Sequence, residues 1–490
     1  MFRAYNQTQT FLLPPNLEDF IKPMHPARLI NDLVEKLDLS ALMRRYGVMG
    51  QPAYAVRMMI KVILYGFTVG IFSSRKLTRA CQENLAFKYL AGMEEPSFKT
   101  FIEFRKRHQQ DMKGVFVQTV KLAKELGLAL FREVALDGTK IEADTSKHKA
   151  MSYGRMQEEE KRLKEQIEGL LKKGQDEDEQ DDQAYGAEHD GYSLPEDLSR
   201  AQERLKKIEE AKAALEAREA KDHPGETIDP KKQISFADKE ARCFAKPGQG
   251  ARYIYNSQAT VDMDTQIIVE NDIEDSVTDA GAVEPALEGM ANESGVVPDR
   301  MAIDGGYANQ ETLESCESRG VTPVCAASPT PPASEKKSSD PARKPSTPIT
   351  VFSYDRQADT FRCPHGVNFL FDHWNGDGTV ALYQSPGPVL CICATRVLKE
   401  GQAIREVAKS RLARRRLQEI LQIPENRKLY GHRKTTIEPV FGQIKQGMGF
   451  RRYLYRGIKK VASEWDMVCA AFNLKKITAL LSATPGFATV

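Results

Sequence analysis

The sequence predicts an α/β protein that begins with an all-helical domain and carries two insertions within its α/β core. Three observations predict this fold class. Up to about residue 130, apolar residues recur at helical spacing. From residue 133 onward, short apolar strands alternate with helical segments, which is the order of an α/β sheet. Between the first strands and the later ones lies a long charged segment rich in strong helix formers.

The helical N-terminal domain is expected to span residues 1–130. Residues 26–46 and 55–67 carry apolar side chains at helical spacing. A third helix is expected after Ser73-Ser74, ending at Gly92, and a further one after Pro96-Ser97.

The core is predicted in two parts, residues 131–150 and 251–327. The first part is interpreted as a strand, a turn at Asp137-Gly138 and a second strand. The second part begins with a strand hairpin. A helix over about residues 279–292, a strand ending at Asp304, another helix and a last strand follow.

Two insertions interrupt this core. Residues 151–250 are expected to form an antiparallel helical hairpin whose helices flank the acidic run DEDEQDD. Residues 328–400 are expected to hold a disordered Pro/Ser/Lys-rich linker, over 328–348, and a small β-rich region. Residues 401–490 are expected to form basic C-terminal helices.

Charge and composition limit the classes of function that the sequence can support. The net charge of the 490 residues is only +2, yet residues 402–460 contain sixteen Lys/Arg and four Asp/Glu. Such a stretch is typical of a phosphate-binding surface, although a solvated helix face has the same composition. The start of the chain does not resemble a signal peptide, the longest apolar run is too short to span a bilayer, and the eight cysteines are scattered. We therefore expect a reduced, cytoplasmic protein that does not bind membranes.

Two aspartates each end an apolar run and precede glycine. Asp137 follows Val-Ala-Leu, and Asp304 follows Met-Ala-Ile. A carboxylate that ends a buried strand lies at the sheet edge, where α/β proteins bind ligands. An Asp-Gly pair also opens ordinary turns, so each motif by itself fits a turn equally well.

Glu438 is the one acid in the basic stretch KTTIEPVFGQIKQGMGFRR. Ile437, Phe441 and Ile444 form an apolar stripe, and Glu438 lies with Lys445 on an adjoining face. A carboxylate near a helix N-terminus is favourable without any function. The many basic neighbours of Glu438 favour the interpretation that it is a metal ligand within a phosphate-binding surface.

Several long motifs occur in an order that resembles the DDE transposases of bacterial insertion sequences, in particular the family numbered eleven-eighty-two. The resemblance covers nearly the whole chain and implies an RNase-H-like, retroviral-integrase-type catalytic core. It rests on LYGFTVGIFSSRKLTRACQEN (64–84), PSFKTFIEFRKRH (96–108), ALDGTKIEADTSK (135–147), YNSQATVD (255–262), AIDGGYAN (302–309), RKTTIEPVFGQIKQGMGFRRYLYRG (433–457) and AAFNLKKI (470–477).

The resemblance implies that Asp137, Asp304 and Glu438 are the catalytic residues and bind two Mg²⁺ or Mn²⁺ ions. Carboxylates suit these hard cations, and two ions can assist both the attacking and the leaving oxygen. The implied enzyme cuts transposon ends with water and joins the freed 3′-hydroxyl to target DNA. The alternatives are an RNase-H-like nuclease or resolvase without strand transfer, and a domesticated DNA-binding protein without activity. Asp262, Glu142 and Asp144 are alternative ligands on sequence alone.

The resemblance also implies DNA contacts. Tyr430, Arg433 and Lys445 match a Tyr-Arg-Glu-Lys signature, with one extra residue between Arg433 and the glutamate, so Lys434 is the alternative for the Arg role. Arg105 and Arg107 are expected to contact phosphates of the terminal inverted repeats. The N-terminal helices could instead be a cap that only packs on the core.

The expected partner is double-stranded DNA, both the terminal inverted repeats and the target. Because two transposon ends must be brought together, we expect a dimer on DNA, associated with the nucleoid when bound.

Cysteine and histidine occur in two close pairs in the β-rich insertion: Cys363 with His365, and Cys391 with Cys393. Two such pairs could form a Cys₃His zinc site. The CxH and CxC spacings chelate less well than CxxC, so the sequence favours ordinary buried thiols over a metal site.

Overall fold

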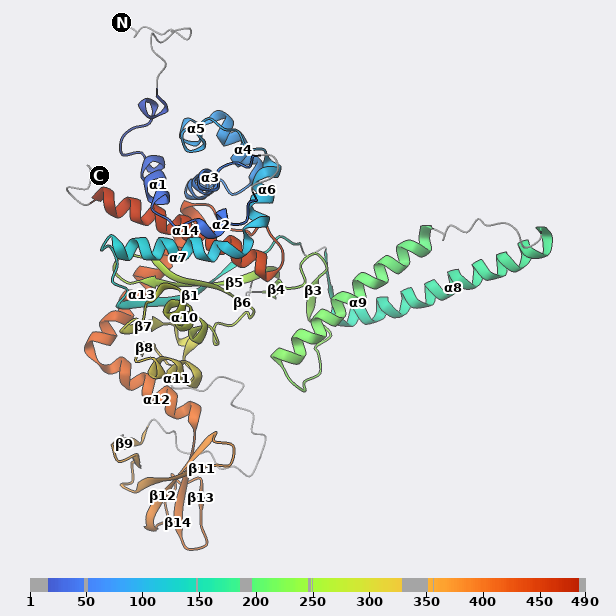
Figure 1. Ribbon diagram of the computed structural model, residues 1–490. Coiled ribbons are helices and arrows are strands. Elements are labelled where there is room, and N and C mark those ends of the chain that lie inside the picture. Colours follow the sequence, from blue (N-terminus) through green and yellow to red (C-terminus); the bar gives the residue numbers. More distant parts are fainter. Residues whose placement is uncertain are drawn as a thin grey trace.

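The computed structural model describes residues 16–47, 52–146, 149–185, 196–245, 248, 250–327, 351–355 and 357–483. The linker expected at 328–348 lies outside the described residues. The N-terminal helices cover one side of a central sheet, a long helical hairpin projects sideways, and a small β domain lies at the end opposite the N-terminal helices (Figure 1). None of the described helices contains a stretch long and apolar enough to cross a membrane.

The N-terminal domain consists of short helices around α3, which is buried on nearly all sides. The helix predicted to run to Gly92 is two helices, because Asn84 breaks it and its side chain caps the second by accepting from Ala86 N–H. The helices are η1 (Leu17–Phe20), α1 (Pro26–Glu35), α2 (Ser40–Met43), α3 (Val56–Thr68), α4 (Ser74–Glu83), α5 (Leu85–Ala91), α6 (Phe98–Arg107), η2 (Gln109–Asp111) and α7 (Met112–Glu125).

The central sheet has the strand order β4-β5-β1-β7-β8, and β6 also pairs with β5. The pairs β1–β5, β4–β5 and β5–β6 are antiparallel, whereas β1–β7 and β7–β8 are parallel. The strands are β1 (Glu133–Glu142), β4 (Arg242–Phe244), β5 (Arg252–Asp262), β6 (Ile268–Glu274), β7 (Arg300–Ile303) and β8 (Thr322–Val324).

The turn predicted at Asp137-Gly138 is wrong, because β1 runs through both residues without a break. Its register with β5 continues from Val134 opposite Asp262 to Glu142 opposite Ile254. At position 138 only a glycine fits between its neighbours, because a Cβ there would lie 2.4 Å from Gln258 Nε2 and 2.6 Å from Asp279 Oδ1. The glycine therefore admits a close polar contact within the sheet instead of a reversal of the chain.

Helices of the core domain cover the sheet. The last helix, α14, packs against β6, α7 and α3 and so joins the N-terminal helices to the sheet in one hydrophobic core. The helix α13 contacts β1, β7 and β8. These helical segments are α10 (Val283–Gly289) with the π-turn η4 (Met290–Ser294), η5 (Gly305–Tyr307), α11 (Gln310–Ser318), α12 (Lys409–Gln422), α13 (Pro424–Gly442), the π-turn η8 (Gln443–Gly447) and α14 (Ile458–Ala483).

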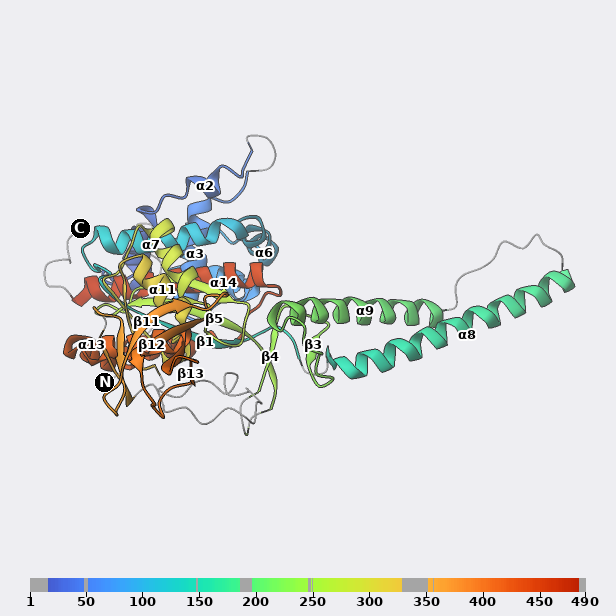
Figure 2. The same ribbon diagram turned by 90° about the horizontal axis from the view of Figure 1, so that it is seen from below.

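The first insertion is a hairpin of α8 (Tyr153–Tyr185) and α9 (Glu196–Asp222), based on the two-stranded sheet of β2 (Ala150–Ser152) and β3 (Gln233–Ser235). The hairpin extends away from the core in both views (Figures 1 and 2). It has a small core of its own near its base. The acidic run expected to separate the helices is itself helical, since α8 continues to Tyr185.

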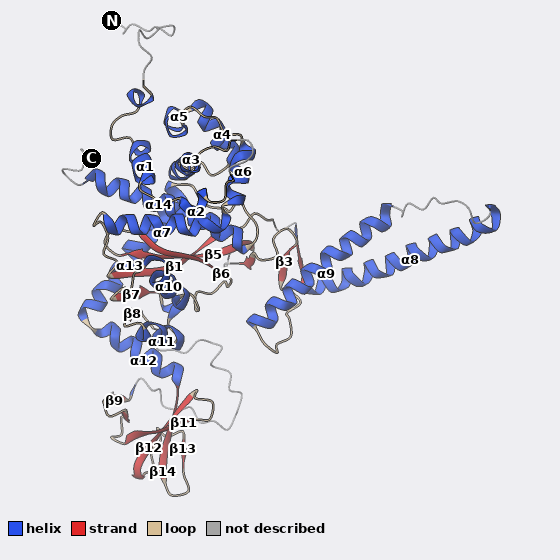
Figure 3. Ribbon diagram, viewed as in Figure 1, coloured by secondary structure: helices blue, strands red, loops and turns tan. Residues whose placement is uncertain are grey.

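The second insertion contains a six-stranded sheet with its own core, clear of the central sheet (Figure 3). Residues 402–408 were expected to be helical, and this is wrong. They form β14, which pairs with β12 and β13, so the basic helices begin only at Lys409. The strands are β9 (Ser353–Asp355), β10 (Thr360–Arg362), β11 (Asn368–Trp374), β12 (Val380–Pro388), β13 (Arg396–Val397) and β14 (Gln402–Ala408).

Candidate active site

Two aspartates meet where two parallel strands lie side by side. In the β1–β7 register Leu136 is opposite Ile303, so the next residues, Asp137 and Asp304, follow at the same level. At this point β7 ends, whereas β1 continues. The side chain of Asp137 is 24% exposed and that of Asp304 55%. Asp304 thus lies at the carboxyl end of its strand, as the sequence predicted, whereas Asp137 lies within β1 beside that end and does not terminate its strand.

One guanidinium joins the two carboxylates. Arg433 on α13 donates from Nη1 to Asp137 Oδ2 at 3.0 Å and from Nη2 to Asp304 Oδ1 at 3.2 Å. Its own side chain is only 5% exposed, and its guanidinium carbon lies 5.9 Å from the centre of the Tyr430 ring. The two acids therefore share a single buried positive charge.

Asp137 has a shifted acidity. Burial raises the pKa of its carboxyl group, while the backbone N–H of Gly138 and the Arg433 guanidinium act in the opposite direction. The negative charge of Asp304 adds to the rise. A second cation between the two carboxylates would relieve this cost, so the pair is suited to binding positive charge.

The third predicted acid does not join the pair in this structure. Glu438 is exposed, whereas Arg433 on the same helix is buried. The two residues are five apart, which places them about 140° apart around a regular α-helix. Among the described residues, the one group of three or more His, Cys, Asp or Glu side chains with ligand atoms within 4.8 Å of one another consists of cysteines. In this structure α13 therefore presents Arg433, and not Glu438, to the aspartates.

Lys445 lies next to the site even though the signature has one extra residue between Arg433 and Glu438. It lies within the π-turn η8, and its Nζ donates to the carbonyl oxygen of Lys140 at 2.9 Å. Lys140 is three residues beyond Asp137 on β1. Arg433 and Lys445 thus both contact β1, and Tyr430 lies beside Arg433, whereas the exposed Glu438 forms no group of close ligand atoms with the aspartates among the described residues.

The three alternative acids have structural partners. Asp262 accepts the backbone N–H groups of Asp264 and Thr265 and so closes the β5–β6 turn. Glu142 pairs with Arg452 at 3.0 Å, and Asp144 pairs with Arg456 at 2.8 Å. These contacts account for all three acids without a metal.

Sequence reasoning missed a polar network around Gly138. Asp279 Oδ1 accepts from Lys140 Nζ at 3.0 Å, Asn256 Nδ2 at 2.7 Å and Gln258 Nε2 at 2.8 Å. Tyr307, just after Asp304, donates to Gln258 Oε1 at 2.7 Å. The available signal was the spacing of Asn256 and Gln258, because two polar residues two apart on a strand share one face.

One of the two arginines expected to contact DNA is turned inward. Arg105 is 4% exposed, donates from Nη1 to the Phe72 carbonyl at 2.9 Å and lies over the Phe67 ring. A phosphate cannot reach it, so Arg105 does not belong to a DNA-contacting surface in this structure. Arg107 is exposed, with its guanidinium stacked 4.8 Å from the Tyr46 ring centre.

Family models match both ends of this architecture. Residues 15–107, the helices up to α6, match a model described as Transposase domain (DUF772). Residues 390–478, which include α12, α13 and most of α14, match a model described as Transposase DDE domain. These two matches support an insertion-sequence DDE transposase. No curated protein matches the chain. Glu438, Arg433 and Lys445 lie within the matched DDE segment, whereas Asp137 and Asp304 precede it.

Proposed function

We propose that the transposase cleaves transposon ends and transfers the freed 3′-hydroxyl into target DNA at a two-metal site of Asp137, Asp304 and Glu438. The observation that carries this proposal is the pairing of Asp137 and Asp304 on neighbouring parallel strands with one cation between them. Two Mg²⁺ or Mn²⁺ ions fit this oxygen donor set and, when bound, would polarise the scissile phosphate.

The sheet supports an RNase-H-like core. Three strands pair antiparallel in the order β6-β5-β1, and two further strands, β7 and β8, continue parallel to β1. The first aspartate lies on the central strand and the second at the end of its parallel neighbour. This is the arrangement that the resemblance to integrase-type enzymes implies.

Arg433 is proposed to exchange partners during the reaction. Without cations it neutralises the two aspartates. Once cations hold these carboxylates, the guanidinium is free to make bidentate contact with a DNA phosphate beside the cleaved bond. Lys445 contributes a second positive charge along β1.

Glu438 requires a change in the phase of α13 to reach the aspartates. A helix that accommodates one extra residue between Arg433 and Glu438, as a π-turn does, would rotate Glu438 toward the sheet. The helix has a weak point nearby, because Pro439 has no N–H to donate to the preceding turn. The same chain already contains a π-turn directly after α13, at η8. We propose that DNA and cations drive this local shift.

Duplex DNA is the proposed partner, both as terminal inverted repeat and as target. The N-terminal domain offers Arg107, and a basic surface lies along the last helices, where the exposed cations include Lys428, Lys434, Arg451, Lys459 and Lys460. Such cations bind phosphates independently of sequence. Joining two ends is proposed to need two copies of the chain on DNA, in the cytoplasm at the nucleoid.

The test is a joining assay with a pre-cut 3′-hydroxyl transposon end, a target plasmid and Mn²⁺. We expect Asp137→Asn, Asp304→Asn and Glu438→Gln each to lower joining by about 100-fold or more, since each removes charge that supports the transition state. Asp264→Asn, in an exposed turn, is the matched control and should join like the wild type. Cleavage without joining by the wild type would indicate a nuclease. Unchanged joining by Glu438→Gln would remove Glu438 from the site.

A further inference from the structure

We propose that the small β domain binds a zinc ion through Cys363, Cys391 and Cys393. This site is separate from the proposed DNA chemistry and is formed entirely within the second insertion. The sequence favoured ordinary buried thiols because CxH and CxC are poor chelating spacings. The arrangement of the three sulfurs in space favours the opposite conclusion.

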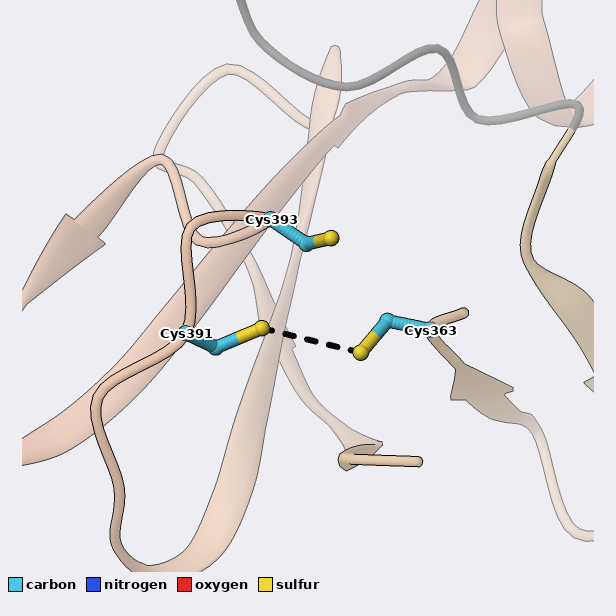
Figure 4. A group of neighbouring side chains, drawn as sticks. All are labelled: Cys363, Cys391 and Cys393. Atoms are coloured by element: carbon cyan, nitrogen blue, oxygen red, sulfur yellow. Dashed lines mark hydrogen bonds between the residues drawn. The ribbon is translucent and has the colours of Figure 1, made fainter. Parts of the chain in front are cut away.

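The three sulfur atoms converge on one point. All lie within 4.8 Å of one another, and the Sγ atoms of Cys363 and Cys391 are 3.6 Å apart. Figure 4 shows the three side chains directed toward the same space from two segments of chain. Zinc–sulfur bonds of about 2.3 Å at tetrahedral angles place two sulfurs about 3.8 Å apart. A disulfide would need about 2.05 Å, so the observed separation fits shared coordination and not a bond.

Two facing turns supply these ligands. In the first, the Gly366 N–H donates to the Cys363 carbonyl at 2.9 Å, and Gly366 has a φ of 83° that suits glycine. In the second, the Ala394 N–H donates to the Cys391 carbonyl at 3.1 Å. Cys363 comes from the first turn, and Cys391 and Cys393 come from the second, so the three sulfurs converge without relying on the CxH spacing. The backbone geometry is present without any further movement of the chain.

The surroundings carry a compensating charge. Three thiolates and one Zn²⁺ have a net charge of −1. Arg405 on β14 is only 1% exposed and donates from Nη1 to the Cys393 carbonyl at 2.8 Å. A zinc–thiolate centre of net charge −1 would lie beside this guanidinium, and opposite charges at close range stabilise each other.

A zinc cross-link would add stability to a domain with a small core. Among the described residues, its buried hydrophobic cluster comprises nine, two of which are Cys363 and Cys393. Small domains with so little core commonly depend on disulfides or structural metals. A zinc ion would connect the turn after β10 to the segment between β12 and β13. The three sulfurs carry the proposal, and the fourth coordination position is left to His365, which lies in the exposed first turn, or to water.

The experiment uses the full-length reduced protein. Zinc content is measured by elemental mass spectrometry, and Co²⁺ replacement is followed by the visible and near-ultraviolet bands of tetrahedral thiolate coordination. We expect about one zinc per chain in the wild type and at least a tenfold weaker affinity in Cys391→Ser. The matched control is Cys243→Ser, a partly buried cysteine on β4, which should retain the metal.

A measurement on the wild type alone guards against misfolding of the variant. Bound zinc should protect Cys363, Cys391 and Cys393 from alkylation, and a chelator should make these three thiols reactive together. The proposal is overturned if the reduced wild type takes up neither zinc nor Co²⁺, if Cys391→Ser binds as tightly as the wild type, or if zinc protects none of the three thiols.

Discussion

Arg433 links the two aspartates of the active site through one guanidinium. It lies between Asp137 and Asp304, where the proposed cations would otherwise neutralise the two carboxylates. Sequence analysis assigned it to DNA phosphates, and its contacts with two acids were not foreseeable, because they depend on how α13 lies across two strands. Its role in the cation-free protein is electrostatic support of the site.

We therefore predict that Arg433→Gln destabilises the cation-free protein by about 1–3 kcal/mol, because two neighbouring carboxylates lose their shared counter-charge. The half-exposed Asp304 limits the cost. Saturating Mg²⁺ should raise the melting temperature of Arg433→Gln more than that of the wild type, since the ion replaces the lost charge. Thermal unfolding in chelator and in Mg²⁺ measures both effects.

The control for this prediction is Arg452→Gln, which removes an exposed arginine paired with Glu142 and should change stability by less than about 1 kcal/mol. Equal melting temperatures for Arg433→Gln and wild type in chelator would show that the bridge contributes nothing to folding.

The two glycines after Asp304 provide a test substitution and its matched control. A Cβ on Gly305 would lie 2.8 Å from the carbonyl oxygen of Ala326, whereas nothing lies within 4 Å of a Cβ on Gly306. Since backbone cannot yield as a side chain does, Gly305→Ala should displace Asp304, lower joining by at least about tenfold and cost about 1–3 kcal/mol of stability. Gly306→Ala should behave like the wild type in both assays. Full activity of Gly305→Ala would contradict this account of the loop.

At the scale of elements, α13 shows what sequence reasoning could and could not predict. The apolar stripe of Ile437, Phe441 and Ile444 was correctly placed, and all three side chains are buried. The extra residue between Arg433 and Glu438 was also visible. Its consequence was not, because the angle between Arg433 and Glu438 around the helix depends on whether the helix absorbs the residue as a π-turn, and local propensity does not determine this.

The two wrong predictions that concern β-strands, at residues 137–138 and 402–408, have one common cause. An Asp-Gly pair favours a turn locally, yet β1 passes through it because pairing with β5 on one side outweighs that preference. Residues 402–408 were expected to be helical with the rest of the C-terminal segment, but pairing with β12 and β13 makes them a strand inside the sheet. In both cases the deciding partner is distant in sequence. The helical hairpin and the β5–β6 hairpin depend on local signals and could be predicted.

One buried amide on α14 hydrogen-bonds the backbone of the sheet and so adds to the packing that holds this helix in place. Asn473 accepts from Ile268 N–H at 2.9 Å and donates to the Ile268 carbonyl at 2.8 Å and to Thr119 at 3.1 Å. We predict that Asn473→Ala costs about 2–4 kcal/mol, because buried backbone groups of β6 lose their partners. Urea unfolding measures the change. Lys475→Ala, exposed on the same helix, should alter stability by less than about 0.5 kcal/mol, and a similar loss in both variants would refute this role.

On the scale of the whole molecule, the two ends of the chain form one body. The helix α14 packs against α1, α3 and α7, so the two segments that match transposase families lie together in space (Figure 1). Both insertions have separate hydrophobic clusters. Sequence predicted the presence of the insertions, but not that the C-terminal helix completes the N-terminal domain, since that contact joins residues hundreds of positions apart.

This shared core contains a buried acidic group that ties folding to pH. Asp466 on α14 is buried, and burial raises its pKa to about 7 in spite of the opposing charge of Lys113. Glu270, Glu293 and Asp272, which face the same space, raise it further. The folded protein therefore holds a proton that the unfolded chain, with an aspartate pKa near 3.8, has already released. The contribution of Asp466 to the free energy of unfolding is therefore complete below about pH 4 and is lost as the pH rises through about 7.

We predict that Asp466→Asn, which cannot ionise, reduces this loss. Between pH 5 and pH 8 the wild type should lose about 1–3 kcal/mol more unfolding free energy than the variant, because only the wild type must keep the carboxyl of residue 466 protonated or bury its charge. Urea titrations at both pH values measure the difference, and Asp264→Asn in an exposed turn should follow the wild type. Parallel pH profiles for wild type and Asp466→Asn would mean that Lys113 already compensates the charge. The junction of the N-terminal helices with α14 would then be insensitive to pH.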